Sequence, residues 1–469
     1  MIEFATLTGT KTTFDMPVVE TALSGRLVTP ASLQYDEARS LWNGMIDRRP
    51  GLIVEAESEQ DVIAAVNFAR EHALSVAVRA GGHNIAGKAL IDGGLAIDVR
   101  AMKRIDVDPV HRRAKVGPGA TLGDVDKATQ AHGLLVPTGI NSTTGIAGLT
   151  LGGGFGWTTR KFGLTVDNLR SARIVTAGGQ LLTVDGNDHP DLFWAIRGGG
   201  GNFGVVTEFE FDLHPAGPEV LAGMLVYPFD DAADVLTAVQ AEIGKAPDTL
   251  TAWAVLRRAP PLPFLPADWH GRHVVVIALC GLGEQAEAAA APFRAIGKPI
   301  ADVVGRMSFS DWQAAFDPLL TPGARNYWKS QDVATLTPPA IDVLVDAVRN
   351  LPTEECEVFV AHVGGQMTRL AADATPWPNR EPHYVINMHT RWRDAADDER
   401  CRAWARHLHE ALAPHSMGSV YVNFIPDGDD DQIANAYGPN QARLQKVKNR
   451  YDSENLFRAN QNVVPDRAA

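Results

Sequence analysis

The chain has 469 residues, of which 45% are hydrophobic and 21% are charged. This balance is typical of a globular protein, and the length favours two domains over a single core. The 43 basic and 56 acidic residues give a formal net charge of −13. An acidic surface repels phosphate backbones, so the composition argues against nucleic-acid binding.

The N-terminal segment and the cysteines bear on the compartment. MIEFATLTGTKTTFDMPVVE lacks the basic start and apolar core of a signal peptide, and no apolar run approaches the roughly 18 residues of a membrane span. Cys280, Cys356 and Cys401 are far apart in the sequence and predict neither a disulfide framework nor a zinc site. We therefore expect a cytoplasmic protein with free thiols and no membrane contact.

Short strands and helices alternate from residue 51 onward. GLIVEA (51–56) predicts a strand, and residues 58–74 predict a helix capped by Ser58. Further strands are expected at 75–80, 95–99, 114–119, 172–177 and 204–213. We predict an α+β domain over residues 47–217, which ends where HPAGP (214–218) supplies Pro and Gly.

Strands and helices continue to about residue 415. Helices are expected at 232–244, 284–296 and 340–351, and strands at 273–280 and 356–363. The segment 448–465 is rich in amides and is expected to be irregular. Residues 218–415 are therefore predicted to form a second domain.

Glycine gathers between residues 81 and 204, most densely in GGGFG (152–156) and GGGGNFG (198–204). Only glycine lets main chain approach a ligand without an intervening Cβ, so we expect these loops to lie against something bulky. Gly199-x-Gly201-x-x-Gly204 matches the dinucleotide fingerprint, but the strand-like VVTEFEFDL follows where that fingerprint needs a helix. A Rossmann fold is therefore excluded, although glycine-rich main chain can still hold a diphosphate through its N–H groups.

The segment DGDDD (427–431) begins like a calcium-binding loop. Gln432 stands where that loop needs glycine, and Gly438 stands where it needs a bidentate glutamate. We expect a solvated acidic turn and no metal site.

The segment VRAGGHNIAG (78–87) places His83 after two glycines at the end of an apolar strand. Four roles stay open for this histidine: a metal ligand, a catalytic base, a point of cofactor attachment or an ordinary loop residue. A neutral imidazole carries a free ring nitrogen that can act as a nucleophile.

Five segments together resemble the berberine-bridge-enzyme-like flavoproteins of the vanillyl-alcohol-oxidase superfamily. They are VRAGGHNIAG, GGGFGWTTRKFGLTVDNL (152–169), AIRGGGGNFGVVT (195–207), YVNF (421–424) and YDSENLFRANQN (451–462). The resemblance implies an α+β protein of two lobes. A PCMH-type FAD-binding domain over 47–217 would be completed by residues 416–469, and a substrate domain over 218–415 would roof the isoalloxazine ring with an antiparallel sheet flanked by helices.

The resemblance also implies roles for single residues. His83 stands where the histidine of the RxGGH motif bonds the flavin 8α-methyl, and Asn141 replaces the cysteine that makes a second link in many relatives, so a single link is expected. Tyr421 matches the catalytic-base tyrosine of the YxN motif, beside Asn423. The other expected FAD-binding residues are Arg79, Ala80, Gly81, Gly82, Asn84, Thr143, Thr144, Gly145, Gly148, Gly153, Gly154, Gly156, Asn202, Gly204, Val205, Val206, Asn460 and Asn462.

The substrate site is expected in the middle of the chain. In NYWKSQ (326–331), Tyr327, Trp328 and Lys329 would suit a ring-bearing or polar substrate, and the alternative is a strand that packs its aromatics into the core. Further candidates are Gln366, Asn387 and His389.

The reaction implied by the resemblance is hydride removal from a carbon that bears a hydroxyl or an amine. FAD would take the hydride, and O2 would reoxidise it with formation of H2O2. Thr144 lies where the family controls oxygen access, and its small size favours an oxidase; Phe162 lacks the hydroxyl of the plant RKYG tyrosine. The alternatives are a dehydrogenase with another electron acceptor, an oxidative cyclase or tailoring enzyme of secondary metabolism, and a protein with a purely structural flavin. The substrate and the choice between monomer and homodimer stay open.

Overall fold

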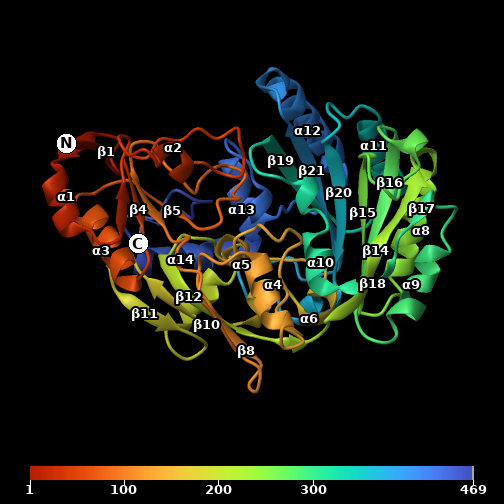
Figure 1. Cartoon of the computed structure of the whole chain (residues 1–469), viewed down its shortest axis with the longest axis horizontal. Helices are drawn as coiled ribbons and strands as arrows, with labels where there is room; N and C mark the ends of the chain where they lie inside the picture. Colours follow the sequence, from red (N-terminus) through yellow and green to blue (C-terminus); the bar gives the residue numbers. More distant parts are fainter. Residues whose placement is uncertain (467–469) are drawn as a thin grey trace.

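The computed structural model describes residues 1–466, which form two lobes side by side (Figure 1). The N-terminal part of the chain builds the first lobe, and the strands between residues 219 and 392 build the large sheet of the second. The C-terminal part then returns to the first lobe (Figure 1). The expected α+β, two-lobed architecture is confirmed.

The first lobe contains a four-stranded sheet in the order β3-β4-β6-β5. Its strands are β3 (Arg26–Val28), β4 (Leu52–Glu55), β6 (Leu95–Asp98) and β5 (Val76–Arg79), with β4 and β5 both parallel to β6. Helix α3 (Glu59–Glu71) makes the crossover from β4 to β5, as parallel strands require. The predicted cap is confirmed, because Ser58 Oγ accepts from the Asp61 N–H at 3.3 Å and the Asp61 carboxylate accepts from the Ser58 N–H at 2.9 Å.

A second sheet of the first lobe is antiparallel, in the order β11-β10-β12-β8-β7. Its strands are β11 (Leu181–Val184), β10 (Leu169–Val175), β12 (Val205–Asp212), β8 (Arg113–Val116) and β7 (Ile105–Asp108). Strand β12 begins directly after GGGGNFG, so the expected absence of a helix after that glycine block is confirmed. The helices of this part are α4 (Leu122–Gln130), α5 (Ile146–Leu151), α6 (Thr159–Phe162) and α7 (Pro190–Ile196).

The second lobe is built on an eight-stranded antiparallel sheet, in the order β17-β14-β16-β15-β20-β21-β19 with β18 beside β14. The strands are β14 (Glu219–Pro228), β15 (Leu250–Arg258), β16 (His273–Gly281), β17 (Ala301–Asp302), β18 (Gly305–Ser308), β19 (Arg325–Val333), β20 (Glu357–Val363) and β21 (His383–Trp392). The expected helices are present as α8 (Ala232–Ile243), α9 (Ala286–Arg294) and α11 (Pro338–Arg349), and α12 (Asp398–Leu412) joins them.

The large sheet is covered on both faces. Alternate residues of its strands share one hydrophobic core with α8, α9, α11 and α12. The others, such as Trp253 and Val385, share a core with Phe155 and Trp157 of the first lobe. Every residue of β21 is consequently buried, and the sheet face toward the first lobe forms one wall between the lobes.

The end of the chain departs from the sequence prediction. Residues 448–451 belong to helix α14 (Gln441–Tyr451), and the irregular tail begins after it. The Lys448 ammonium is fully buried and donates to the Asn202 and Phe457 carbonyls at 2.7 and 2.9 Å and to the Asp452 carboxylate at 2.7 Å. The sequence prediction missed this helix because it was based on polar composition, whereas Lys448 is buried and satisfied by Asp452, Phe457 and the distant Asn202 carbonyl. The last three residues of the expected segment 416–469 lie outside the described residues.

Four of the five residues of the acidic turn (427–431) are exposed, as expected, and three of its carboxylates form ion pairs. Asp429 pairs with Lys329 of β19, Asp430 with Lys88 and Asp427 with Arg48. Asp429 is only 19% exposed. Because Lys329 belongs to the second lobe and Lys88 and Arg48 belong to the first, the turn is bound to both lobes. Within residues 1–466, the three cysteines are free and buried, no helix is long and apolar enough to cross a membrane, and no three metal-ligating side chains gather.

Candidate active site

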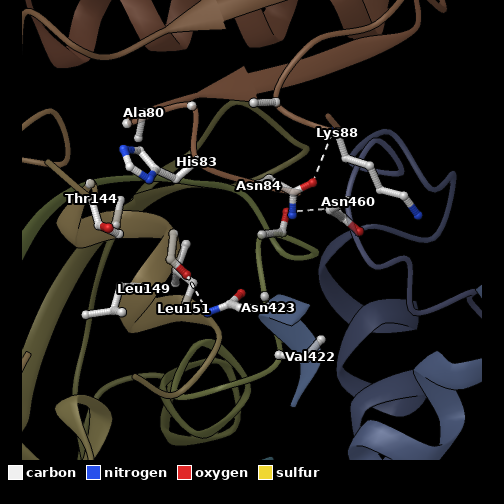
Figure 2. A pocket seen from close by; sticks show the side chains of 18 of the residues that line it. Ala80, His83, Asn84, Lys88, Thr144, Leu149, Leu151, Val422, Asn423 and Asn460 are labelled. Carbon is white, nitrogen blue, oxygen red and sulfur yellow. Dashed lines mark hydrogen bonds between the residues drawn. The ribbon is translucent and has the colours of Figure 1, made fainter. Parts of the chain in front are cut away.

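A cavity of about 340 Å³ opens between the lobes and is lined by both. The first lobe contributes the loop after β5, helix α5 with the loop before it, and the glycine-rich segment before β12. The second lobe contributes β19, β20 and β21, and the segments around Tyr421 and Asn460 close the remaining side. Figure 2 shows His83 and Asn84 on one side of this cavity, with Leu149, Leu151 and Asn423 across from them.

His83 lies at the cavity wall, where Trp42 covers one face of its ring and Thr143 meets one ring nitrogen. Its Nε2 is 3.3 Å from the Thr143 hydroxyl, and the Trp42 ring stacks on the imidazole with centroids 5.1 Å apart and planes 21° apart. Desolvation by the surrounding protein lowers the pKa of His83 to about 4. The imidazole is therefore neutral at physiological pH, which is the form that can act as a nucleophile.

Glycines shape the cavity in two ways. A Cβ on Gly81 would lie 2.5 Å from the Gly145 nitrogen, so the two loops touch only because both residues are glycine. A Cβ on Gly148 or Gly201 would meet no protein atom within 4 Å, although both residues line the cavity. The space beside these two glycines is cavity, so a flat ligand can lie directly on the main chain there. This glycine cradle fits an FAD molecule.

Tyr421 stands in an aromatic cluster beside the cavity. Its hydroxyl accepts a hydrogen bond from Asn423 Nδ2 at 2.8 Å, and the rings of Phe155, Trp377 and Phe424 lie 4.8 to 5.1 Å away. Burial raises the pKa of Tyr421 to about 12, against the hydrogen bonds from Asn423 and the Gly154 N–H. The phenol is therefore protonated at neutral pH, and proton removal by Tyr421 would need the form that burial disfavours.

Glu357 and His389 form a hydrogen-bonded pair on the sheet face toward the first lobe, and both line the cavity. Glu357 Oε1 lies 3.0 Å from His389 Nδ1, and Glu357 Oε2 lies 2.6 Å from Arg257 Nη1. Burial opposes ionisation of this carboxyl, but the Arg257 charge and the His389 hydrogen bond outweigh it and hold the pKa of Glu357 at about 2. The pair is thus a carboxylate beside an imidazole.

The chain matches two family models, one described as an FAD binding domain over residues 50–185 and one as berberine and berberine like over residues 420–464. An FAD-linked oxidoreductase of Dictyostelium discoideum is 32% identical over 95% of this chain and 95% of its own. The (R)-6-hydroxynicotine oxidase of Paenarthrobacter nicotinovorans is 29% identical over 95% of this chain and all of its own.

The chain belongs to the berberine-bridge-enzyme-like FAD-linked oxidoreductases. Its cofactor is FAD, as the predicted resemblance implied. The crystal structure of 6-hydroxy-D-nicotine oxidase from Arthrobacter nicotinovorans superposes with a TM-score of 0.85 at 29% identity, covering 95% of this chain and 98% of the other. The xylooligosaccharide oxidase of Myceliophthora thermophila shares the fold with a TM-score of 0.83 at 22% identity, covering 95% and 98% of the two chains.

Most of the expected FAD-binding residues of this berberine-bridge-enzyme-like chain line the cavity. They are Ala80, Gly81, Gly82, His83, Asn84, Thr144, Gly145, Gly148, Gly204, Val205, Val206 and Asn460. Thr143 stands behind them and touches the cavity only through its contact with His83. The loops quoted for the resemblance therefore converge on one cavity, although they lie more than 300 residues apart in the chain.

Other expected FAD-binding residues support the cavity from outside. Arg79 does not line the cavity; its guanidinium donates to the Ser40 carbonyl and lies 3.9 Å from the Asp98 carboxylate. Asn202 joins the glycine-rich segment to the tail through the Gly199 and Gln461 carbonyls, at 2.8 and 3.0 Å. Asn462 likewise does not line the cavity.

The GGGFG glycines also lie outside the cavity. A Cβ on Gly153 would collide with Trp377, one on Gly154 with Thr165 and one on Gly156 with the Thr138 carbonyl. These glycines are therefore needed where the turn packs against protein, and Gly154 in addition holds Tyr421.

Only one residue of NYWKSQ reaches the cavity. Neighbouring side chains of a strand point to opposite faces, so Trp328 lines the cavity while Tyr327 and Lys329 face away. Tyr327 packs in the core of the helix side, and Lys329 pairs with Asp429. Gln366 lies outside as well, bonded to Arg369 in a short 3-10 helix.

His389 and Asn387 line the cavity, and they have neighbours that the sequence prediction missed. These are Trp42, Leu320, Glu357, Phe359 and Phe424. A signal was present in EVFVAHV (357–363), where a carboxylate begins a strand whose only other polar residue is His362. Trp42 could not be found in this way because it lies before the predicted FAD-binding domain and reaches the site only through tertiary packing.

Proposed function

We propose that this enzyme is an oxidase that removes a hydride from a carbon bearing a hydroxyl or an amine in a small organic substrate. In this proposal His83 is the single covalent link to FAD, and O2 is the final electron acceptor and yields H2O2. Support for C–N chemistry comes from the hydroxynicotine oxidase, which is similar to this chain over nearly its whole length. Thr144 lines the cavity and is small, so it would leave room for O2 beside the flavin ring.

The observation that carries the proposed link is the state of His83. Its ring is neutral, lines the cavity and is held in one orientation by Trp42 and Thr143. Asn141 also lines the cavity, but it is a hydrogen-bond acceptor for the Thr143 N–H and hydroxyl at 3.0 and 2.6 Å. An amide is no nucleophile toward a flavin methyl, which supports one link rather than two.

In this proposal the protein's own residues bind FAD and orient the substrate. When bound, FAD supplies the two-electron acceptor. Main-chain N–H groups of the glycine-rich loops would hold its diphosphate, and Gly148 and Gly201 leave the space for its ring. Trp328 and Phe424 would orient the substrate, and the protonated Tyr421, held by Asn423, would donate a hydrogen bond to it. We propose the cytoplasm as the compartment because free, reduced thiols persist there.

Denaturation tests the link directly. The purified protein is precipitated with acid, and the yellow colour is expected to stay with the polypeptide. His83→Ala is expected to bind FAD but release it on denaturation, whereas His111→Ala, which changes an exposed histidine, should keep it. Release of all flavin from the unchanged protein would refute the covalent link.

A second experiment tests the reaction. Panels of sugars, alkaloids and amines are added without oxygen, and bleaching of the flavin absorbance identifies a substrate. Air is then admitted, and rapid return of the colour with stoichiometric H2O2 is expected. Slow return of the colour would instead favour the dehydrogenase, and failure of every compound to bleach the flavin would favour a structural cofactor.

A further inference from the structure

Four side chains from four neighbouring strands stand in one row across the large sheet. The register pairs Arg257 of β15 with Glu357 of β20, Glu357 with His389 of β21, and His389 with Trp328 of β19. Directly paired residues of antiparallel strands project from the same face and touch. The row therefore runs from a cation through a carboxylate and an imidazole to an indole, on the face that lines the cavity.

The hydrogen bonds along the row assign the imidazole protons. An ionised Glu357 can only accept, so the 3.0 Å contact places a proton on His389 Nδ1. In the neutral ring Nε2 then carries the lone pair. Nε2, which one ring carbon separates from Nδ1, is buried and has no hydrogen-bond partner. A buried nitrogen without a partner is costly unless a ligand supplies one.

We infer that His389 Nε2 accepts the O–H or N–H proton of the substrate, and that the substrate is a planar, ring-bearing molecule which presents this group to the imidazole. The O–H or N–H bond breaks, the proton moves to Nε2, and the bonding pair stays on the oxygen or nitrogen. Glu357 is a positioning residue that sets the tautomer. The inference rests on the proposed function only for the later removal of the hydride.

The charges around the imidazole favour this transfer. The imidazolium that forms would lie against the Glu357 carboxylate, so the proton moves toward a negative charge. Glu357 is shared with Arg257, which lies 2.6 Å from its other carboxylate oxygen, so the imidazolium joins an existing ion pair. Arg391 on β21 is instead paired with Glu355 at 2.8 Å. The neighbour on β19 is the uncharged Trp328. Tyr421, the alternative acceptor, has rings and neutral donors around it instead.

The walls beside His389 indicate the substrate class. The Trp328 ring meets the imidazole edge-on at 4.5 Å, and the rings of Phe424 and Trp42 lie 5.5 and 5.8 Å from Trp328. Phe359 adds a fourth ring, and Asn387 is the polar neighbour on this part of the sheet. Flat aromatic surfaces stabilise planar rings by stacking and burial, whereas an oligosaccharide would need polar partners for many hydroxyls.

A coloured phenol tests the inference without a known substrate. 4-Nitrophenol is added to the holoenzyme at a pH below the pKa of the free dye, where the free dye is colourless. If Nε2 takes the proton, the bound dye shows the nitrophenolate band in a difference spectrum against the holoenzyme. Absence of this band in the unchanged enzyme would overturn the inference, whether the dye fails to bind or binds as the neutral phenol.

Three variants locate the acceptor. His389→Gln keeps a polar side chain but has no nitrogen that can take the proton, so the band should disappear and the dye should bind about tenfold more weakly. Glu357→Gln can still accept the Nδ1–H but removes the negative charge, so the bound dye should ionise only at higher pH. His362→Gln, on β20 but outside the cavity, is the matched control and should leave the band unchanged.

Retention of the full band in His389→Gln would assign the proton to another group and overturn the inference. A structural role of Glu357 alone would lower the amount of bound dye but not the pH at which that dye ionises. The result is independent of flavin turnover. An enzyme that ionises the dye but is bleached by no substrate would contradict the proposed function while leaving the proton acceptor assigned.

Discussion

Trp42 stacks on His83 with ring centroids 5.1 Å apart, although the two residues belong to different segments of the first lobe. The indole covers one face of the imidazole, and the Thr143 hydroxyl meets its Nε2 at 3.3 Å. These contacts orient the ring and shield it from water, so the His83 imidazole is neutral rather than cationic.

The first prediction concerns the pH dependence of flavin attachment. The ordinary histidine pKa is about 6.5, and desolvation lowers the pKa of His83 to about 4. Apoprotein mixed with FAD should therefore form the acid-stable yellow product at a rate that is flat through the weakly acidic range and falls only as the pH drops through about 4. The measurement is protein-bound absorbance after acid precipitation. A rate that falls around the ordinary histidine pKa would contradict the lowered value.

The second prediction concerns the space beside Gly148. In a His83→Ala background, where FAD binds reversibly, Gly148→Ala should weaken FAD binding by about tenfold or more, because overpacking costs about 1–3 kcal/mol. The apoprotein should not be destabilised, since the new Cβ meets no protein atom and alanine favours helix α5. Fluorescence titration with FAD and thermal unfolding of the apoprotein measure the two effects.

Gly186→Ala is the matched control for this prediction. A Cβ at Gly186 also meets no protein atom, but this residue lies outside the cavity. FAD affinity should be unchanged in the control. Equal affinities in all three proteins would mean that the flavin does not lie against Gly148.

The third prediction concerns Asp126, which is buried between the lobes. Burial raises the pKa of Asp126 to about 7, against the hydrogen bond that Gln313 of the second lobe donates at 3.1 Å. The native state thus keeps a proton that the unfolded state loses near pH 4, so the stability that Asp126 contributes is greatest below that pH and is lost as the pH rises through about 7. The expected slope is about 1.4 kcal/mol of unfolding free energy per pH unit.

Asp126→Asn should remove this dependence because the amide does not titrate. The difference in unfolding free energy, variant minus wild type, should rise between about pH 4 and pH 7 and then level off. Urea unfolding at several pH values measures it. A difference that does not change with pH would show that Asp126 titrates normally in the folded protein.

The fourth prediction concerns the ion pair between Lys329 and Asp429, whose side chains are 10% and 19% exposed. Asp429→Asn leaves a nearly buried ammonium without its partner and should cost about 3 kcal/mol of unfolding free energy. Asp346→Asn is the control, because Asp346 and its partner Arg349 are 73% and 59% exposed and loss of this pair should cost less than about 1 kcal/mol. Changing Lys329 to Met in the Asp429→Asn protein should restore part of the loss. Equal effects of the two single changes would contradict the difference in burial.

Much of the first lobe could be predicted from local patterns. Ser58 with Asp61 three residues later marks the start of α3, and alternating residues after GGGGNFG mark β12. The position of His83 after two glycines likewise follows from its motif. In each case the deciding interactions lie within a few residues of one another, so a short stretch of sequence is sufficient.

The residues of the large sheet that line the cavity could not be predicted in the same way. Tyr327, Trp328 and Lys329 are adjacent in the chain, but alternation places only Trp328 in the cavity once the sheet face is known. The burial of Lys448 in α14 was missed for a related reason, since the Asn202 carbonyl that accepts from its ammonium lies 246 residues earlier in the chain.

The sequence by itself determined the order of the cofactor motifs and the α+β class, because these depend on short-range patterns of glycine, hydrophobicity and caps. The two lobes and the expected FAD-binding loops were implied by the family resemblance that those motifs carry. Only the tertiary structure decided which residues share the cavity. Glu357 and His389 are 32 positions apart and meet through the register of β20 and β21, and Trp42 reaches His83 through packing. Such contacts depend on how the strands pair and how the two lobes pack against each other. These arrangements are set by residues far apart in the chain, so no short stretch of sequence predicts them.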